Sequence, residues 1–225
     1  MRRNYPYFWV IPVLVGLVFI FSNVFWLVPF INNVRIDVER YQLAVAERIA
    51  SQADFFLEKK LRELGDLVVS FIKISSNKNK TSSIINDFLK NNPDFVSVKL
   101  MPKSFQDGSY FVSPIFINDG KKVFALRLSL SFMEKDIEAV VDLSNFINSV
   151  SQEKIGEKGY AYVLDGSRNI IFHPLGALQT NPEDFVTITT KSNSTGWIVA
   201  VEDPIEEALI KEFYALILAV FFFSK

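Results

Sequence analysis

Residues 7–31 of the chain contain no charged side chain over 25 consecutive positions. A helix of this length rises about 37 Å, which exceeds the ~30 Å hydrocarbon core of a bilayer. Arg2 and Arg3 precede the run, whereas the charges that follow it are mixed, so residues 1–6 are expected in the cytoplasm. A cleaved signal peptide would have a shorter apolar core and a small-residue site directly after it. The sequence therefore predicts an uncleaved membrane anchor over residues 7–31.

Residues 33–75 are expected to form one long helix or two joined ones. They contain no proline and a single glycine, Gly65. Apolar residues recur at spacings of three and four, the pattern of an amphipathic helix: Val34, Val38, Tyr41, Val45, Ile49, Leu57, Leu61, Leu64, Val68 and Phe71. If continuous, this helix is about 60 Å long. Its first half is expected to form either a homodimer seam near the bilayer or a cover for a sheet, and its second half a cover.

A short helix ending near Leu89 and then four strand-like runs follow. The runs cover residues 95–101, 110–118, 122–132 and 137–143, and Asp-Gly pairs at 107–108 and 119–120 mark turns between the first three. In the third run an apolar face alternates with a more polar one, which is typical of a half-buried antiparallel sheet. A short helix over residues 144–151 is expected next.

A β-hairpin is the clearest local signal of the chain. Two β-rich runs, residues 160–164 and 169–172, flank a turn that begins with Asp165 and Gly166, and His173-Pro174 closes the hairpin. Two more strands are expected over residues 185–190 and 197–201, with a turn at 193–196 between them. These four strands predict a second small sheet.

The hairpin also carries a family resemblance. Its pattern Gly-x-x-Gly-Tyr-Ala-Tyr-x-Leu-Asp, with glycines at Gly156 and Gly159, is followed by Ile-Ile-x-His-Pro. This resembles the hairpin of the Cache sensor domains found outside the cytoplasm in bacterial chemoreceptors, histidine kinases and diguanylate cyclases. Weaker similarity extends over residues 33–212, and residues 196–204 resemble the closing strand of that family.

The resemblance implies an α+β fold with antiparallel sheets, in which PAS-like modules stack on one long helix. For a double Cache domain the membrane-distal module would cover residues 76–155 and the smaller membrane-proximal module residues 156–204. A single-module arrangement stays open at this point. Residues 205–225 are expected to be a C-terminal helix, and its apolar run from 213 to 223 is about half as long as a membrane span needs. This run is expected to be the start of a second transmembrane span, with a short interfacial helix as the alternative.

Composition excludes several classes of function. The net charge of −1 gives no basic field for nucleic acid, and the absence of cysteine excludes disulfides and thiolate chemistry. The single histidine, His173, is expected to fix its turn by a ring hydrogen bond, and Asp165 is expected to be an ordinary turn residue. No phosphate loop, nucleophile elbow or metalloprotease motif is present. We therefore expect no enzyme, no catalytic residue, no metal site and no cofactor.

Tyr110, Arg127 and Asp142 are the candidate ligand contacts, chosen by residue type and strand position. The alternative for each is a salt bridge or a solvated position. Amino-acid-binding Cache domains use an Arg-x-Trp-Tyr element, a Tyr-x-Asp pair and an aspartate near the end of the first module. Asp142 matches the last of these, which implies that it holds an ammonium group. The other two elements are absent, since residues 114–117 read Pro-Ile-Phe-Ile where the Tyr-x-Asp pair would fall.

The sequence thus predicts the input module of a transmembrane signalling protein, which senses a small molecule outside the cytoplasm. Its expected partners are the plasma membrane, an unidentified small-molecule ligand and a second copy bound through the long helix, without nucleic acid. A helix movement between two states would carry the signal across the membrane. The alternative is a membrane-anchored scaffold protein without a ligand, in which the chain's 22 phenylalanines fill the pocket.

Overall fold

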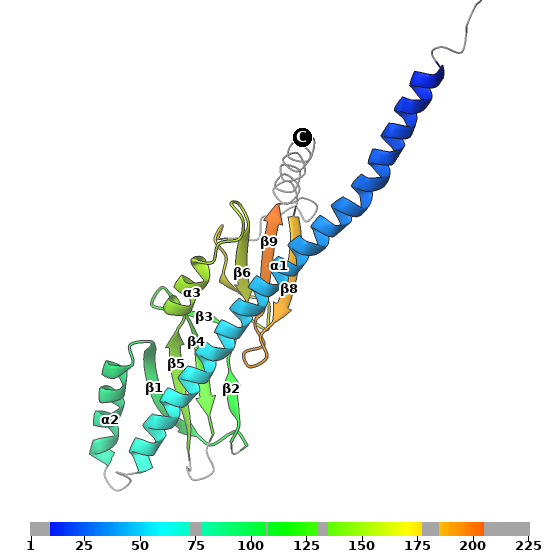
Figure 1. Ribbon diagram of the computed structural model, residues 1–225. Helices are drawn as coiled ribbons and strands as arrows, with labels where there is room; N and C mark the ends of the chain where they lie inside the picture. Colours follow the sequence, from blue (N-terminus) through cyan, green and yellow to red (C-terminus); the bar gives the residue numbers. More distant parts are fainter. Residues whose placement is uncertain (1–9, 73–77, 107, 130–134, 177–184, 205–225) are drawn as a thin grey trace, which may run out of the picture.

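One long helix runs along the whole molecule and two antiparallel sheets pack against it (Figure 1). The structure is a computed structural model that describes residues 10–72, 78–106, 108–129, 135–176 and 185–204. Helix α1 (Val10–Ile72) is continuous over 63 residues, so the long helix expected from residue 33 begins earlier and contains Pro29. Among the residues that the structure describes, none of the helices has both the length and the apolar character that a bilayer crossing requires.

The distal sheet lies at the end of the molecule where α1 ends. Its strands are β1 (Phe95–Pro102), β2 (Tyr110–Val112), β3 (Phe116–Asn118), β4 (Lys121–Leu128) and β5 (Lys135–Asp142). The strand order is β1-β5-β4-β2, and β3 also pairs with β4. Helix α2 (Lys78–Asn91) lies beside α1 and β1. It is the short helix that the sequence predicted to end near Leu89, and it ends two residues later.

The expected strand over residues 110–118 is broken into β2 and β3, and the break has a local cause. Val112 pairs with Leu126 and Phe116 with Val123, so three residues face two across the gap, which is a β-bulge. Pro114 lies in the bulge and has no N–H to offer to the ladder. Ser113 bonds Ala125 through both its backbone N–H and its side-chain oxygen.

The proximal sheet follows helix α3 (Ser144–Ser151), which forms where the sequence predicted it. It contains β6 (Tyr160–Leu164), β7 (Ile170–Phe172), β8 (Phe185–Lys191) and β9 (Ile198–Pro204) in the order β7-β6-β9-β8. The predicted hairpin and second sheet are therefore present. The apolar run after residue 205, read as the start of a second span, lies outside the described residues.

The glycines of the hairpin motif have a steric reason. Gly156 has a φ of 58°, in the left-handed region that favours glycine. At Gly159 a Cβ atom would lie 2.6 Å from the backbone oxygen of Ile155, with which Gly159 forms an isolated bridge. The chain thus needs both glycines to turn from α3 into β6.

A continuous apolar core joins α1 to both sheets. Val45 and Ile49, in the part of α1 for which a dimer seam was one expectation, belong to this core, and α1 contacts β8 and β9 there. Tyr41, predicted on the same apolar series, is instead 53% exposed. Trp197 at the start of β9 packs edge-on against Phe124 of β4 at 5.8 Å between ring centroids. The two sheets therefore share one core.

Polar bonds also connect the two sheets. The Asp165 carboxylate of the hairpin turn accepts a 3.0 Å hydrogen bond from the N–H of Ile115, which the β-bulge turns away from β4. The Lys122 ammonium donates to the carbonyl oxygens of Ile170 and Ile171 on β7 at 3.1 and 2.9 Å. These hydrogen bonds connect the distal sheet to the proximal hairpin.

Candidate functional site

The outer face of the distal sheet, turned away from α1, holds two of the three predicted contacts. Residues paired across neighbouring strands lie on the same face of a sheet. Arg127 pairs with Glu138 and Val123 with Asp142, whereas the alternate residues of β4 and β5 face the core. Arg127 and Asp142 therefore share the outer face. Val123, the partner of Asp142, precedes Arg127 by four residues on β4, so Arg127 and Asp142 are about 13 Å apart along the strand direction.

The Arg127 guanidinium is held within the chain on several sides. Its Nε donates to Glu138 Oε2 at 3.1 Å, and its Nη1 donates to Ser104 Oγ at 3.1 Å. The guanidinium also lies over the ring of Phe105, 5.3 Å from the centroid. These contacts fix the guanidinium in place, and its side chain is still 20% exposed, so the cation can be reached from solvent.

The Asp142 carboxylate is buried and strongly bonded at the other end of this face. Its Oδ2 accepts from the Lys121 ammonium at 2.7 Å, and its Oδ1 accepts from the Ser144 N–H at 2.8 Å and the Ser144 hydroxyl at 2.6 Å. Burial by itself raises the pKa of the Asp142 carboxyl, but these hydrogen bonds outweigh burial and hold the pKa below its usual value. Asp142 is ionised at neutral pH, and through Ser144 it also holds the first residue of α3.

Tyr110 lies on the opposite face of the sheet. It pairs with Leu128, whose partner Ile137 belongs to the core beside α1. The Tyr110 hydroxyl donates to the carbonyl oxygen of Ser194 in the turn between β8 and β9, at 3.4 Å. The structure thus brings Arg127 and Asp142 to one face and does not bring Tyr110 to them.

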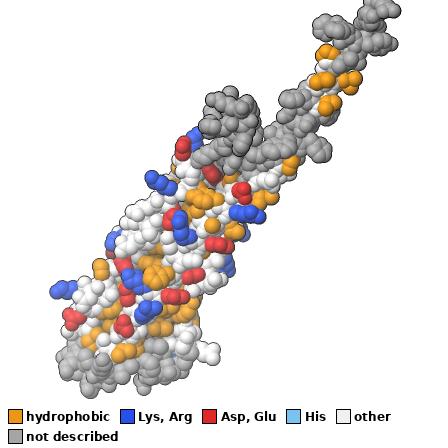
Figure 2. Space-filling model, viewed as in Figure 1, with side chains coloured by type: hydrophobic (Ala, Val, Ile, Leu, Met, Phe, Trp, Pro, Cys, Tyr) orange, Lys and Arg blue, Asp and Glu red, His pale blue; other side chains and the backbone are white. Residues whose placement is uncertain are grey.

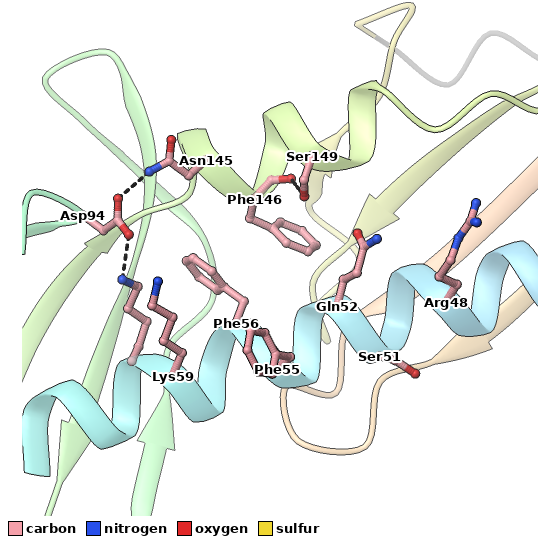
Figure 3. A pocket seen from close by; sticks show the side chains of 11 residues that line it. Arg48, Ser51, Gln52, Phe55, Phe56, Lys59, Asp94, Asn145, Phe146 and Ser149 are labelled. Atoms are coloured by element: carbon pink, nitrogen blue, oxygen red, sulfur yellow. Dashed lines mark hydrogen bonds and ion pairs between the residues drawn. The ribbon is translucent and has the colours of Figure 1, made fainter.

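The α1–α3 groove, a second candidate site, was missed by the sequence reasoning. It is a surface cavity of about 540 Å³ between α1, α3 and the start of β1 (Figure 3). Phe56 of α1 and Phe146 of α3 point toward each other in it, and Gln52 points from α1 into the same space. One signal was present in the sequence: because Phe55 and Phe56 are adjacent on a helix, both cannot face one core, and Phe55 is 67% exposed.

The proximal sheet carries a buried polar cluster on its own outer face. Glu202 of β9 accepts hydrogen bonds from the hydroxyls of Tyr160 at 2.7 Å and Tyr162 at 3.0 Å. Burial and the nearby Glu202 charge raise the pKa of Tyr162 to about 12. The His173 ring packs against both tyrosines, and burial lowers its pKa. Its Nδ1 accepts from the Leu175 N–H at 3.1 Å, the ring hydrogen bond that the sequence predicted.

Charged side chains of both signs are interspersed on the face seen in Figure 2. Within the described ranges, no three His, Asp or Glu side chains come together in a way that could hold a metal ion.

Solved structures share this fold. No family model and no curated protein matches the sequence. The ligand-binding domain of the Pseudomonas fluorescens chemoreceptor CtaA, solved with L-isoleucine, matches with a TM-score of 0.61 and 16% identity over 80% of this chain and 98% of that one. The domain of the Pseudomonas aeruginosa amino-acid chemoreceptor PctC, solved with GABA, matches with a TM-score of 0.57 and 14% identity over 73% and 99%.

An extracellular domain assigned to the histidine kinase rpHK1S-Z16 matches with a TM-score of 0.56 and 12% identity over 77% of this chain and 97% of that one. The chain thus has the fold of these ligand-binding domains of chemoreceptors and of this extracellular domain of a histidine kinase. The match covers 97–99% of the length of each of the three domains.

Proposed function

We propose that the chain is the extracytoplasmic input module of a transmembrane signalling protein and that it senses a small molecule. The observation that carries the proposal is the shared fold, because amino-acid chemoreceptor domains match it over 98–99% of their length. The low identity leaves the ligand to be inferred from this chain's own residues.

The outer face of the distal sheet is the proposed ligand site. Asp142 would hold the ammonium group of the ligand, and Arg127 would bind a carboxylate or another acceptor at the far end. Ala125 and Val140, paired across β4 and β5, form an apolar floor between them. In the structure Lys121 occupies the position of the ammonium group on Asp142, so ligand and Lys121 compete for the same oxygen.

The proposed mechanism is a population shift. A ligand that displaces Lys121 changes the end of β5, where Asp142 also bonds Ser144, the first residue of α3. The bonds from Lys122 to β7 and from Ile115 to Asp165 link the distal sheet to the proximal one, which α1 also contacts. Ligand binding would then favour one arrangement of α1 against the proximal sheet.

The membrane placement is part of the proposal. Residues 7–31 would anchor the module in the plasma membrane, with the sheets outside the cytoplasm and a second span beginning after residue 205. A second copy would bind through α1. Tyr41, Phe55 and Val69 support this, since they are 53%, 67% and 48% exposed and recur every fourteen residues, which places them on one stripe of the helix.

A thermal-shift screen of the full chain in detergent tests the proposal, with amino acids, amines and carboxylates as probes. A ligand at 100 times its dissociation constant adds about 2.7 kcal/mol, which raises the melting temperature by roughly 5–10 °C. We expect Asp142→Asn and Arg127→Gln to abolish the shift, and Asp87→Asn and Arg62→Gln, at exposed positions, to keep it.

Lys121→Gln gives a sharper result. It removes the competitor for Asp142, so an amine ligand should bind more tightly than to the unchanged chain. A ligand whose affinity falls in this variant contradicts the proposed site.

The second candidate function is a membrane-anchored scaffold without a ligand. One observation favours it: the charges of Arg127 and Asp142 are already paired within the chain. A cooperatively melting sample that no probe shifts would support the scaffold.

A further inference from the structure

The α1–α3 groove is a separate cavity that the proposed sensing site does not use. It lies on the α1 side of the distal sheet, whereas Arg127 and Asp142 lie on the other side. Its volume of about 540 Å³ is within the range of small-molecule pockets. The groove is open to solvent, and the side chains at its two ends differ in chemistry (Figure 3).

The floor of the groove is aromatic. The rings of Phe56 and Phe146 lie 5.7 Å apart between centroids with a 39° tilt, and Phe146 is only 3% exposed. Phe146 is fixed from behind by Trp197, at 5.3 Å. Such a rigid pair of rings favours a flat apolar ligand, because aromatic rings gain from offset or edge contacts beyond their buried area.

At one end of the groove a buried hydrogen-bond acceptor lacks a donor. The Gln52 Nε2 donates to Glu153 Oε1 at 3.2 Å, which leaves its Oε1 facing the groove side. Gln52 Oε1 is buried and has no hydrogen-bond partner within the described part of the chain. A buried acceptor without a donor lowers the stability of the fold, and a ligand O–H or N–H at this point would donate to it.

At the other end lies a weakly held cation. The Lys59 side chain is 57% exposed, and its ammonium is 3.9 Å from Glu63 Oε1. The second oxygen of Glu63 is bound more closely, at 2.8 Å, by the buried Lys60, which also binds Asp94 at 2.6 Å. Lys60 and Asp94 thus satisfy each other, and Lys59 is the cation that an anionic ligand can recruit.

Gln52 and Lys59 are seven residues apart on α1, so two helical turns, about 10.5 Å, separate them along the axis. The Phe56 ring lies between the two. From this order of acceptor, ring and cation we infer that the groove binds a small aromatic carboxylate that carries a hydroxyl at the far end of its ring. The carboxylate pairs with Lys59, the ring packs on Phe56 and Phe146, and the hydroxyl donates to Gln52 Oε1.

Isothermal titration of the full chain in detergent with 3-(4-hydroxyphenyl)propanoate tests this inference, with empty micelles as the blank. We expect saturable binding at millimolar concentration or below. 3-Phenylpropanoate, which lacks the hydroxyl, should bind roughly fivefold to tenfold more weakly, because Gln52 Oε1 then stays without a donor.

Two variants locate the site. Lys59→Gln should weaken binding roughly tenfold, and Phe56→Leu by a similar factor, whereas Lys90→Gln, the same charge change on the exposed side of α2, should leave binding unchanged. Lys59 is on the surface, so its variant tests the site even if Phe56→Leu fails to fold.

Arg127→Gln, on the outer face of the distal sheet and without a contact to α3 in the described part of the chain, should also leave this binding unchanged, which separates the groove from the proposed sensing site. The inference is overturned if the probe does not bind, if Lys59→Gln binds it as well as the unchanged chain, or if Arg127→Gln abolishes binding.

Discussion

Replacing Asp165 should uncouple the two sheets, and its two oxygens allow the contributions to be separated. Oδ1 accepts from the N–H groups of Ser167 and Asn169 within the hairpin turn, both at 2.8 Å. Oδ2 accepts from the Asn169 side chain at 2.8 Å and from the N–H of Ile115 in the distal sheet at 3.0 Å. Asp165 is 1% exposed, so water does not easily replace it.

Asp165→Ala removes all four bonds. Water can reach the exposed turn residues, but the half-buried Ile115 N–H loses its carboxylate acceptor. A hydrogen bond to a charged group contributes about 1.5–3 kcal/mol. With the weakened turn we expect a loss of roughly 2–4 kcal/mol. For a chain of this size that lowers the melting temperature by roughly 5–15 °C.

Asp165→Asn separates the turn from the link between sheets. Its amide oxygen can replace Oδ1 and keep the turn, while its NH2 group faces the Ile115 N–H, donor against donor. We expect a loss of roughly half that of Asp165→Ala.

Thermal unfolding of the full chain in detergent, followed by circular dichroism, measures both variants. Asp87→Ala on the exposed side of α2 is the control and should change the melting temperature by less than about 1 °C. If both Asp165 variants have the same melting temperature as this control, the Asp165 carboxylate does not hold the two sheets together.

Three further predictions concern stability and are checked by the same melts. Gly159→Ala should destabilise the fold by several kcal/mol, because the new Cβ would lie 2.6 Å from the Ile155 carbonyl oxygen. Gly65→Ala, on α1 with open space around it, should instead stabilise the fold by about 0.5–1 kcal/mol, and equal effects of the two variants would contradict this prediction. Trp197→Ala should cost about 3–5 kcal/mol, since Trp197 is 1% exposed and packs on rings from β4 and α3; a loss below 1 kcal/mol would exclude a shared core. Stability should fall as the solution is acidified below about pH 4. Four aspartates have a folded-state pKa below the ordinary value of 3.8, so they stabilise the fold above that pH and lose this contribution as the pH falls through the folded pKa: Asp54, Asp136, Asp142 and Asp165. A melting temperature independent of pH between 5 and 2.5 would refute this assignment.

Local sequence signals were sufficient for most of the secondary structure. The spacing of apolar residues in 33–75 predicted one long helix or two joined ones, and α1 is continuous there, with core residues along it that pack against both sheets. Alternation predicted the faces of β4, and the Asp165-Gly166 turn between two β-rich runs predicted the hairpin of β6 and β7. These features depend on neighbours within a few residues.

The candidate site depended on contacts that the sequence does not specify. Tyr110 was chosen by type, but its face is set by the register of β2 against β4, which the Ser113–Ile115 bulge determines. The salt bridge of Arg127 needs Glu138 directly opposite, eleven residues along the chain. The α1–α3 groove exists only because two helices distant in sequence meet over Phe56 and Phe146.

The central claim, that this chain is an input module for signalling, is tested most directly by a chimera. Residues 1–225 would be joined in frame to the kinase output of a characterised histidine kinase, and autophosphorylation would be measured in membranes against the ligand found in the thermal-shift screen. The account predicts a dose-dependent change with a midpoint near the dissociation constant, absent in Asp142→Asn. A ligand that binds the chimera without changing phosphorylation would contradict the account.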